Sequence, residues 1–83
     1  MVEVKVYTTD YCPFCHAAKS LLEGKGIAYE EVHITSPSEK AALYEKTGMM
    51  TVPQIFIDGE LIGGFQELRN LDETGELDKQ LKA

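Results

Sequence analysis

The first 34 residues alternate between strand-like and helix-like patterns, and this alternation restricts the possible folds more than any other feature of the chain. In residues 2–8, VEVKVYT, every second side chain is apolar, which predicts a strand with one apolar face. Residues 16–26, HAAKSLLEGKG, carry apolar side chains at helical spacing and close with two glycines, so we expect a helix that ends there. Residues 27–34, IAYEEVHI, predict a second strand. A helix between two strands predicts a parallel pair with a right-handed crossover.

The residues after the second strand carry the signals of a helix N-terminus. Ser36 suits an N-cap, Pro37 the first helical position, and Glu39, three residues after the serine, completes a capping box. Gly48 predicts the end of this helix.

The second half of the chain predicts a hairpin and more helix. In residues 54–62, QIFIDGELI, two short apolar runs flank Asp58-Gly59, a dipeptide that favours a type I′ turn between antiparallel strands. Residues 65–83 predict a short helix and a terminal turn or two, with a break near Gly75. The order is strand–helix–strand–helix–strand–strand–helix. We therefore expect an α/β domain with a mixed four-stranded sheet and helices on both faces.

Length and charge narrow the class of protein. A chain of 83 residues forms one domain, so we expect residues 1–83 to fold as a single unit. The net charge of −6 argues against nucleic-acid binding, which favours basic surfaces. The N-terminus lacks the pattern of a secretory signal, and no stretch resembles a membrane span. We expect a cytoplasmic monomer without membrane association. In that reducing compartment, a lone cysteine pair is catalytic or metal-binding more often than structural.

The two cysteines, Cys12 and Cys15, are separated by two residues and followed by His16, and several chemistries use such a pair. A structural zinc site needs four ligands, and the other obvious ligands are His16 and His33. The spacing C-x-x-C-H also matches haem attachment, with Met49 or Met50 as an axial ligand. The predicted strands, however, do not suit a small helical haem protein. A further interpretation is that both cysteines are buried structural thiols. A pair beside a strand–helix–strand unit favours a redox dithiol and no metal site.

The position of the pair supports redox chemistry. Cys12 follows the first strand, and Pro13 begins the helix, so the Cys12 sulfur meets unpaired N–H groups and the positive end of the helix dipole. Both stabilise a thiolate, so we expect the pKa of Cys12 to lie below the free value of about 8.5. Cys15 lies about one turn further on, where it can displace a mixed disulfide formed at Cys12.

A second motif, TVPQIFI at residues 51–57, contains a proline directly before an apolar strand. We expect a cis peptide bond between Val52 and Pro53 that turns the Val52 backbone toward the sulfurs. Its N–H and C=O groups would then pair with a bound peptide as an added strand does.

With CPFC and TVPQIFIDG in place, the chain resembles the glutaredoxins, and most closely the small single-domain bacterial dithiol type. The resemblance covers nearly the whole chain, through VYTTDYCPFCHAAKSLL, TVPQIFIDGELIGG and the overall length. It implies a thioredoxin-like fold and glutathione-dependent reduction of protein disulfides and glutathione mixed disulfides. Glutathione would be a co-substrate, and no cofactor would be tightly bound. Cys12 would be the nucleophile and Cys15 the resolving thiol.

The resemblance also implies a glutathione site. Phe14 would form an apolar wall, Thr51, Val52 and Pro53 would pair with the cysteinyl part, and the turn near the γ-glutamyl part would be Gly63, Gly64 and Phe65 followed by Gln66 and Glu67. Glu67 would meet the γ-glutamyl ammonium. Thr9 and Met49 stand where relatives commonly have a lysine and an arginine or other polar residue, which would weaken binding of the glycyl carboxylate several-fold.

Two alternatives to an ordinary glutaredoxin follow from these departures. One is a glutaredoxin-like protein that takes electrons from a thioredoxin reductase and serves a reductase such as that for ribonucleotides. The other is a binding module in which two subunits and glutathione hold an iron–sulfur cluster through Cys12, which Pro13 disfavours.

Overall fold

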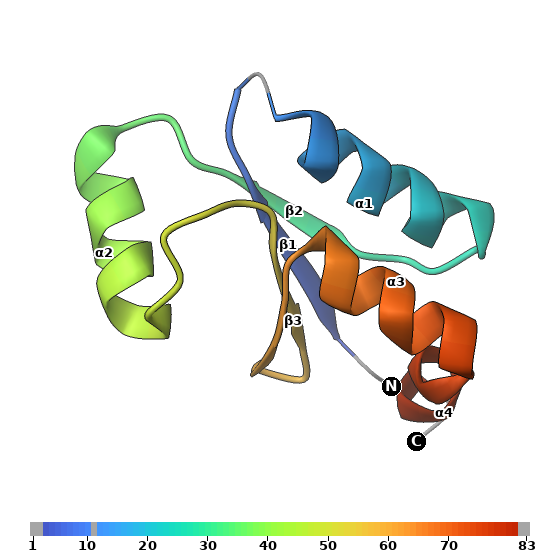
Figure 1. Ribbon diagram of the computed structural model, residues 1–83. Helices are drawn as coiled ribbons and strands as arrows, with labels where there is room; N and C mark the ends of the chain where they lie inside the picture. Colours follow the sequence, from blue (N-terminus) through green and yellow to red (C-terminus); the bar gives the residue numbers. More distant parts are fainter. Residues whose placement is uncertain (1–2, 11, 82–83) are drawn as a thin grey trace.

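The structure, a computed structural model, describes residues 3–10 and 12–81, so Val2 of the predicted first strand lies outside the described residues. Within these described residues, four strands and four helices follow one another (Figure 1). They are β1 (Val4–Thr8), α1 (Pro13–Gly24), β2 (Glu30–His33), α2 (Pro37–Thr47), β3 (Gln54–Ile57), β4 (Glu60–Gly63), α3 (Phe65–Thr74) and α4 (Glu76–Leu81). The predicted order is confirmed, including the break at Gly75. No helix within the described ranges is both long and apolar enough to span a membrane.

The four strands form one mixed sheet in the order β2-β1-β3-β4. β1 and β2 are parallel, with Val6 opposite Glu31, as the crossover through α1 requires. β1 pairs antiparallel with β3, with Val6 opposite Ile55, and β3 pairs antiparallel with β4. Asp58 and Gly59 both have positive φ, 51° and 80°, as the predicted type I′ turn demands.

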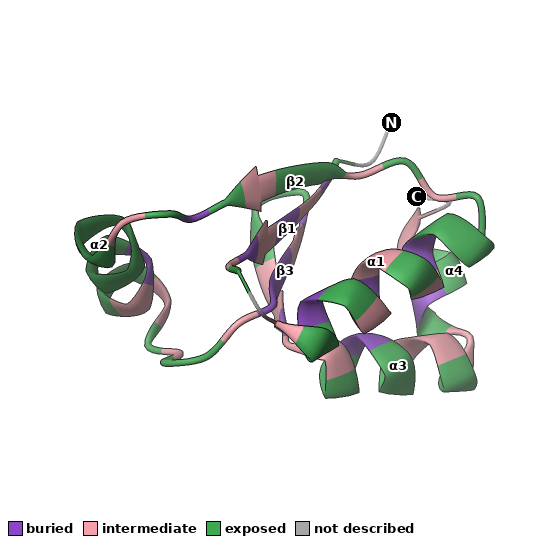
Figure 2. Ribbon diagram, turned by 90° about the horizontal axis from the view of Figure 1, so that it is seen from above, coloured by how far each residue is buried: buried purple, intermediate pink, exposed green. Residues whose placement is uncertain are grey.

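The core lies between the sheet and helices α1, α3 and α4. Alternate residues of β1 are buried, and they face these helices. The purple segments of α1 and α3 in Figure 2 mark the helical contribution to the same core. Its members are Val4, Val6, Ala18, Leu22, Ile55, Ile57, Leu68 and Leu77. This single cluster fixes the start of α1, and with it the cysteine pair, over the end of β1.

Helix α2 lies on the side of the sheet opposite α1 and α3 (Figures 1 and 2), so helices flank both faces as predicted. Ser36 is its N-cap and accepts a hydrogen bond from the Glu39 N–H at 3.2 Å, and Gly48 ends it with φ 76°. The Glu39 carboxylate accepts from the Ser36 hydroxyl at 3.0 Å, so only half of the predicted capping box forms. Leu43 is the one buried side chain of α2, which leaves this helix lightly packed.

The second strand is shorter than predicted, because residues 27–29 form a connection to β2. The Ile27 N–H donates to the Leu22 carbonyl at 3.0 Å, which closes the end of α1. Ile27 and Tyr29 still pack against the core, so their apolar pattern reflects burial without strand pairing.

Candidate active site

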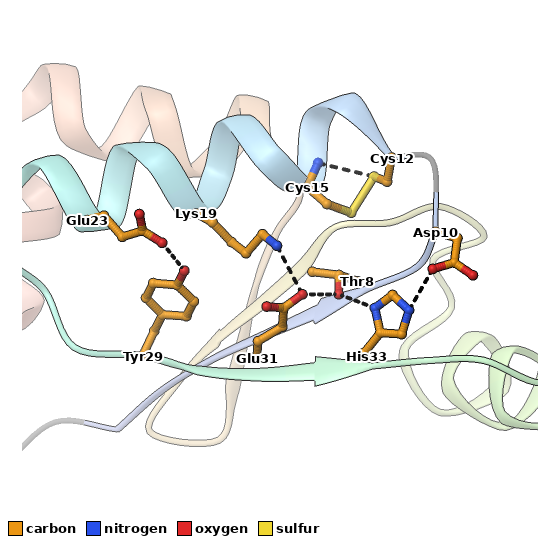
Figure 3. Close-up of polar contacts among 9 residues, drawn as sticks. All are labelled: Thr8, Asp10, Cys12, Cys15, Lys19, Glu23, Tyr29, Glu31 and His33. Atoms are coloured by element: carbon orange, nitrogen blue, oxygen red, sulfur yellow. Dashed lines mark hydrogen bonds and ion pairs between the residues drawn. A yellow bond between two sulfur atoms is a disulfide. The ribbon is translucent and has the colours of Figure 1, made fainter.

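Cys12 and Cys15 form a disulfide at the N-terminus of α1 (Figure 3). Cys12 is the N-cap residue, Pro13 is the first helical residue, and the Cys15 N–H donates to Cys12 Sγ at 3.1 Å. A sulfur in this position replaces the hydroxyl or carboxylate that caps many helices. The helix N-terminus thus presents an N–H donor and the positive end of the helix dipole to the Cys12 sulfur.

The two sulfurs differ in their access to solvent. Cys15 is only 2% exposed, whereas Cys12 is half-buried at the surface. Cys12 is therefore the more accessible of the two residues. Its Cα lies 5.2 Å from that of Cys15, within the usual range for a disulfide.

The peptide bond between Val52 and Pro53 is cis, which confirms the prediction. Cys12 Sγ lies 3.7 Å from the Val52 carbonyl oxygen, so the Val52 backbone does stand beside the sulfurs. Gln54, which is fully buried, donates from Nε2 to the carbonyls of Met49 and Thr51, both at 3.1 Å. This amide ties the loop of residues 49–53 to the start of β3.

Gln54 was not recognised as a site residue from the sequence. The available signal was a polar residue at the first position of an otherwise apolar strand. A buried amide needs hydrogen-bond partners, and the unpaired carbonyls of the preceding loop are the nearest ones.

A groove of about 360 Å³ lies along the loop of residues 49–53 and the start of α3, and we call it the active-site groove. Phe14 and Phe65 stack across it with ring centroids 6.2 Å apart. The lining residues are Phe14, Met49, Thr51, Val52, Pro53, Gly64, Phe65, Gln66 and Glu67. Eight of the nine residues that the resemblance placed at a glutathione site line this groove, together with Met49. The ninth, Gly63, is buried and does not line the groove.

Glu67 has a structural role that was not foreseen. Its Oε1 accepts a hydrogen bond from the Gly64 N–H at 2.8 Å, which caps the start of α3. Gly63 makes this possible, because a Cβ added there would lie 2.6 Å from that oxygen. A carboxylate has about four acceptor positions, so Glu67 can cap the helix and still accept from a ligand.

A chain of polar contacts runs beneath the disulfide, across β1 and β2 (Figure 3). The Thr8 hydroxyl donates to Glu31 Oε2 at 2.7 Å, and Lys19 Nζ donates to the same oxygen at 3.1 Å. His33 lies 3.3 Å from the Thr8 hydroxyl through Nδ1 and 2.9 Å from Asp10 Oδ1 through Nε2. The hydrogen bonds from Thr8 and Lys19 hold the pKa of Glu31 below its ordinary value.

This chain of contacts was also missed from the sequence, which gave His33 no role beyond possible metal binding. The signal was Thr8, a hydroxyl on the buried face of a strand. Its partners are 23 and 25 residues away, and only the parallel register of β1 and β2 identifies them.

Residues 3–10 and 12–81 contain no group of three or more His, Cys, Asp or Glu side chains arranged to hold a metal ion. His16 is exposed on α1, and His33 is engaged with Asp10 and Thr8. Neither histidine joins the cysteines in such a group, and the cysteine pair lies beside the active-site groove.

Known proteins share this arrangement. The family model described as glutaredoxin matches residues 4–62. The chain is 43% identical to glutaredoxin 3 of Escherichia coli (strain K12) over 83 residues, which cover 99% of this chain and 100% of the relative. The solution structure of glutaredoxin from Brucella melitensis matches with a TM-score of 0.83 and 41% identity, covering 99% of this chain and 90% of that one. The buckwheat glutaredoxin–glutathione complex matches with a TM-score of 0.88 and 30% identity, covering 98% and 77%.

The expected thioredoxin-like fold is therefore confirmed, and the cysteine pair is the redox-active disulfide of a thiol–disulfide oxidoreductase. The match to the family model and the identity to the bacterial relative each extend over most of the chain. By sequence, fold and cysteine pair, this chain belongs to the glutaredoxin family.

Proposed function

We propose that this protein reduces glutathione mixed disulfides and protein disulfides, with glutathione as the co-substrate. The observation that carries the proposal is the active-site groove, which extends from the Val52 backbone beside Cys12 to the start of α3. The match to a buckwheat relative that was crystallised with glutathione supports this choice of ligand. No tightly bound cofactor takes part in the proposed reaction.

The glutathionyl group would occupy the groove in an extended form. Val52 would pair with its cysteinyl backbone, Phe14 and Phe65 would cover its apolar parts, and Glu67 would accept from the γ-glutamyl ammonium. Thr51 and Gln66 would add neutral hydrogen-bonding groups at either end.

The proposed reaction of a glutathione mixed disulfide has two steps. The Cys12 thiolate attacks the glutathionyl sulfur, a new S–S bond forms, and the substrate leaves as a thiolate that takes a proton from solvent. A second glutathione, as thiolate, attacks that sulfur, so that glutathione disulfide leaves and the Cys12 thiolate is restored. The net reaction is a thiol–disulfide exchange in which one free glutathione and the glutathionyl group of the mixed disulfide leave as glutathione disulfide, and the substrate thiol is released.

Protein disulfides would follow a different second step. Cys12 forms a mixed disulfide with one substrate sulfur and releases the other as a thiolate. Cys15, as thiolate, then attacks Cys12, which releases the second substrate thiolate and forms the Cys12–Cys15 disulfide seen here. Two glutathione molecules reduce this disulfide in turn. The burial of Cys15 and the access to Cys12 support this order.

The test is turnover of a small glutathione mixed disulfide coupled to glutathione reductase, with wild-type protein, Cys15→Ser and Cys12→Ser. We expect Cys15→Ser to retain this activity and to lose most reduction of a protein disulfide, while Cys12→Ser loses both. Equal loss of both activities in Cys15→Ser would contradict the assigned roles, and no turnover by wild-type protein would contradict the proposal.

One observation favours a second candidate, in which a thioredoxin reductase supplies the electrons. Among the described residues that line the groove there is no lysine, arginine or histidine to meet the glycyl carboxylate of glutathione. Running the assay in parallel with thioredoxin reductase separates the two. Turnover with that reductase alone would assign the second function.

Several expectations remain predictions that need separate experiments. They are a monomeric state, a cytoplasmic location, which suits a dithiol that must stay reduced, and ribonucleotide reductase among the protein substrates. The cluster-binding alternative requires two copies of the chain. Brown colour and an iron signal after anaerobic purification with glutathione would establish it.

A further inference from the structure

The active-site groove has an unusual balance of charge for a site proposed to hold an anionic tripeptide. Of its nine described lining residues, five are apolar or aromatic and three are glycine or uncharged polar residues. Glu67 carries the only formal charge among the nine. The ring of Phe14 in this lining is itself 64% exposed, so apolar surface of the groove faces solvent.

Three basic side chains on or next to α1 and α3 form ion pairs with residues that do not line the groove. On α1, Lys19 pairs with Glu31 at 3.1 Å, and Lys25, the C-cap residue that follows α1, pairs with Asp72 at 2.6 Å. On α3, Arg69 pairs with Glu73 at 3.0 Å. The whole chain carries a net charge of −6.

We infer that the groove selects polypeptide disulfides whose cysteines are flanked by apolar residues and by lysine or arginine, and that it discriminates against acidic ones. The inference rests on the dithiol chemistry proposed above but not on glutathione as the electron donor. An extended segment beside Val52 places one flank on the rings of Phe14 and Phe65 and brings the other toward Glu67.

The size of the effect follows from the setting. Glu67 is exposed, so its attraction for one substrate charge is worth a factor of about 1.5–5 in rate, as for other exposed ion pairs. With a basic residue in one peptide and an acidic residue in the other, attraction and repulsion combine to a ratio of several-fold. The screening length of about 8 Å at physiological ionic strength means that high salt removes most of this ratio.

The experiment mixes fully reduced protein with short peptide disulfides in a single turnover, without glutathione. Two symmetrical disulfides share an apolar core around cysteine and end in lysine or in glutamate. Each rate is divided by the rate of the same peptide with dithiothreitol, which removes differences in the intrinsic reactivity of the two disulfides. We expect the basic peptide to react several-fold faster at low salt and the ratio to approach one at high salt.

Two variants locate the effect. Met49→Lys places a cation in the groove and should lower the ratio at least twofold, whereas Ala41→Lys makes the same change of net charge on the exposed face of α2 and should leave the ratio near the wild-type value. A wild-type ratio of one at low salt, a faster acidic peptide, or an equal effect of both variants would overturn the inference.

The outcome is separable from that of the proposed function. If the peptides react with the expected ratio while glutathione-coupled turnover fails, the inference stands and the electron donor is another reductant. If glutathione mixed disulfides turn over and neither peptide reacts, the inference alone is overturned.

Discussion

The contact between Gly63 and Glu67 yields a prediction that joins fold stability to the shape of the active-site groove. Gly63 has φ 131°, and a Cβ there would lie 2.6 Å from Glu67 Oε1 and 2.8 Å from its Cγ. In Gly63→Ala the backbone strain costs about 1–3 kcal/mol. The carboxylate must also leave the Gly64 N–H, which removes a cap worth about 0.5–2 kcal/mol. The expected loss of unfolding free energy is about 1.5–5 kcal/mol, a large part of the stability of so small a domain.

Urea unfolding of the oxidised protein, followed by circular dichroism, measures this loss, and a double-mutant cycle with Glu67→Ala tests its origin. In the Glu67→Ala background, Gly63→Ala should cost only the backbone strain, so the two costs should fall short of additivity by about 0.5–2 kcal/mol. Gly59→Ala is the matched control: its φ is 80° with nothing within 4 Å of the added Cβ, and it should show no coupling to Glu67. Fully additive costs of Gly63→Ala and Glu67→Ala would refute the reasoning.

Three further predictions concern Leu22, Glu31 and Gln54. Leu22→Ala, at a fully buried position, should lower the unfolding free energy by about 2–5 kcal/mol in urea titrations, and a loss below 1 kcal/mol would contradict the core assigned here. The Thr8 hydrogen bond is the chief cause of the lowered pKa of Glu31, so the stabilising effect of Glu31 is present above pH 4.5 and is lost as the pH falls through the lower pKa of the folded state. Glu31→Gln should therefore have a lower unfolding free energy than wild type at neutral pH, and the difference should disappear in acid. A difference that does not change with pH would count against this. Gln54→Leu should cost about 1–3 kcal/mol and speed amide hydrogen exchange in residues 49–53, whereas unchanged exchange would show that the amide does not order this loop.

The parts of the fold that the sequence predicted correctly are set by local chemistry. Both long helices begin at a proline preceded by a capping side chain, at Pro13 and Pro37. The hairpin turn is determined by Asp58 and Gly59 alone, through their positive φ values. Such signals involve residues within three or four positions of one another, so they can be recognised without knowledge of the tertiary structure.

What the sequence did not predict depends on contacts between distant segments. Glu31 meets Thr8 only because the register of two parallel strands places them together. Residues 27–29 looked like strand because Ile27 and Tyr29 are apolar, but their burial comes from packing against α1 and the core. Apolar periodicity reports burial, and it cannot tell a strand from an extended connection that packs on the same core.

The order of strands in the sheet has a consequence for how the protein behaves in concentrated solution. Strand β2 is an edge of the sheet, so one side of its backbone is free of strand pairing and offers a template to another chain. It carries Glu30 and Glu31 in succession, and both are exposed. Two copies that approach through this edge bring like charges together, which discourages edge-to-edge stacking at neutral pH. Substitutions that remove these charges would therefore favour aggregation through β2.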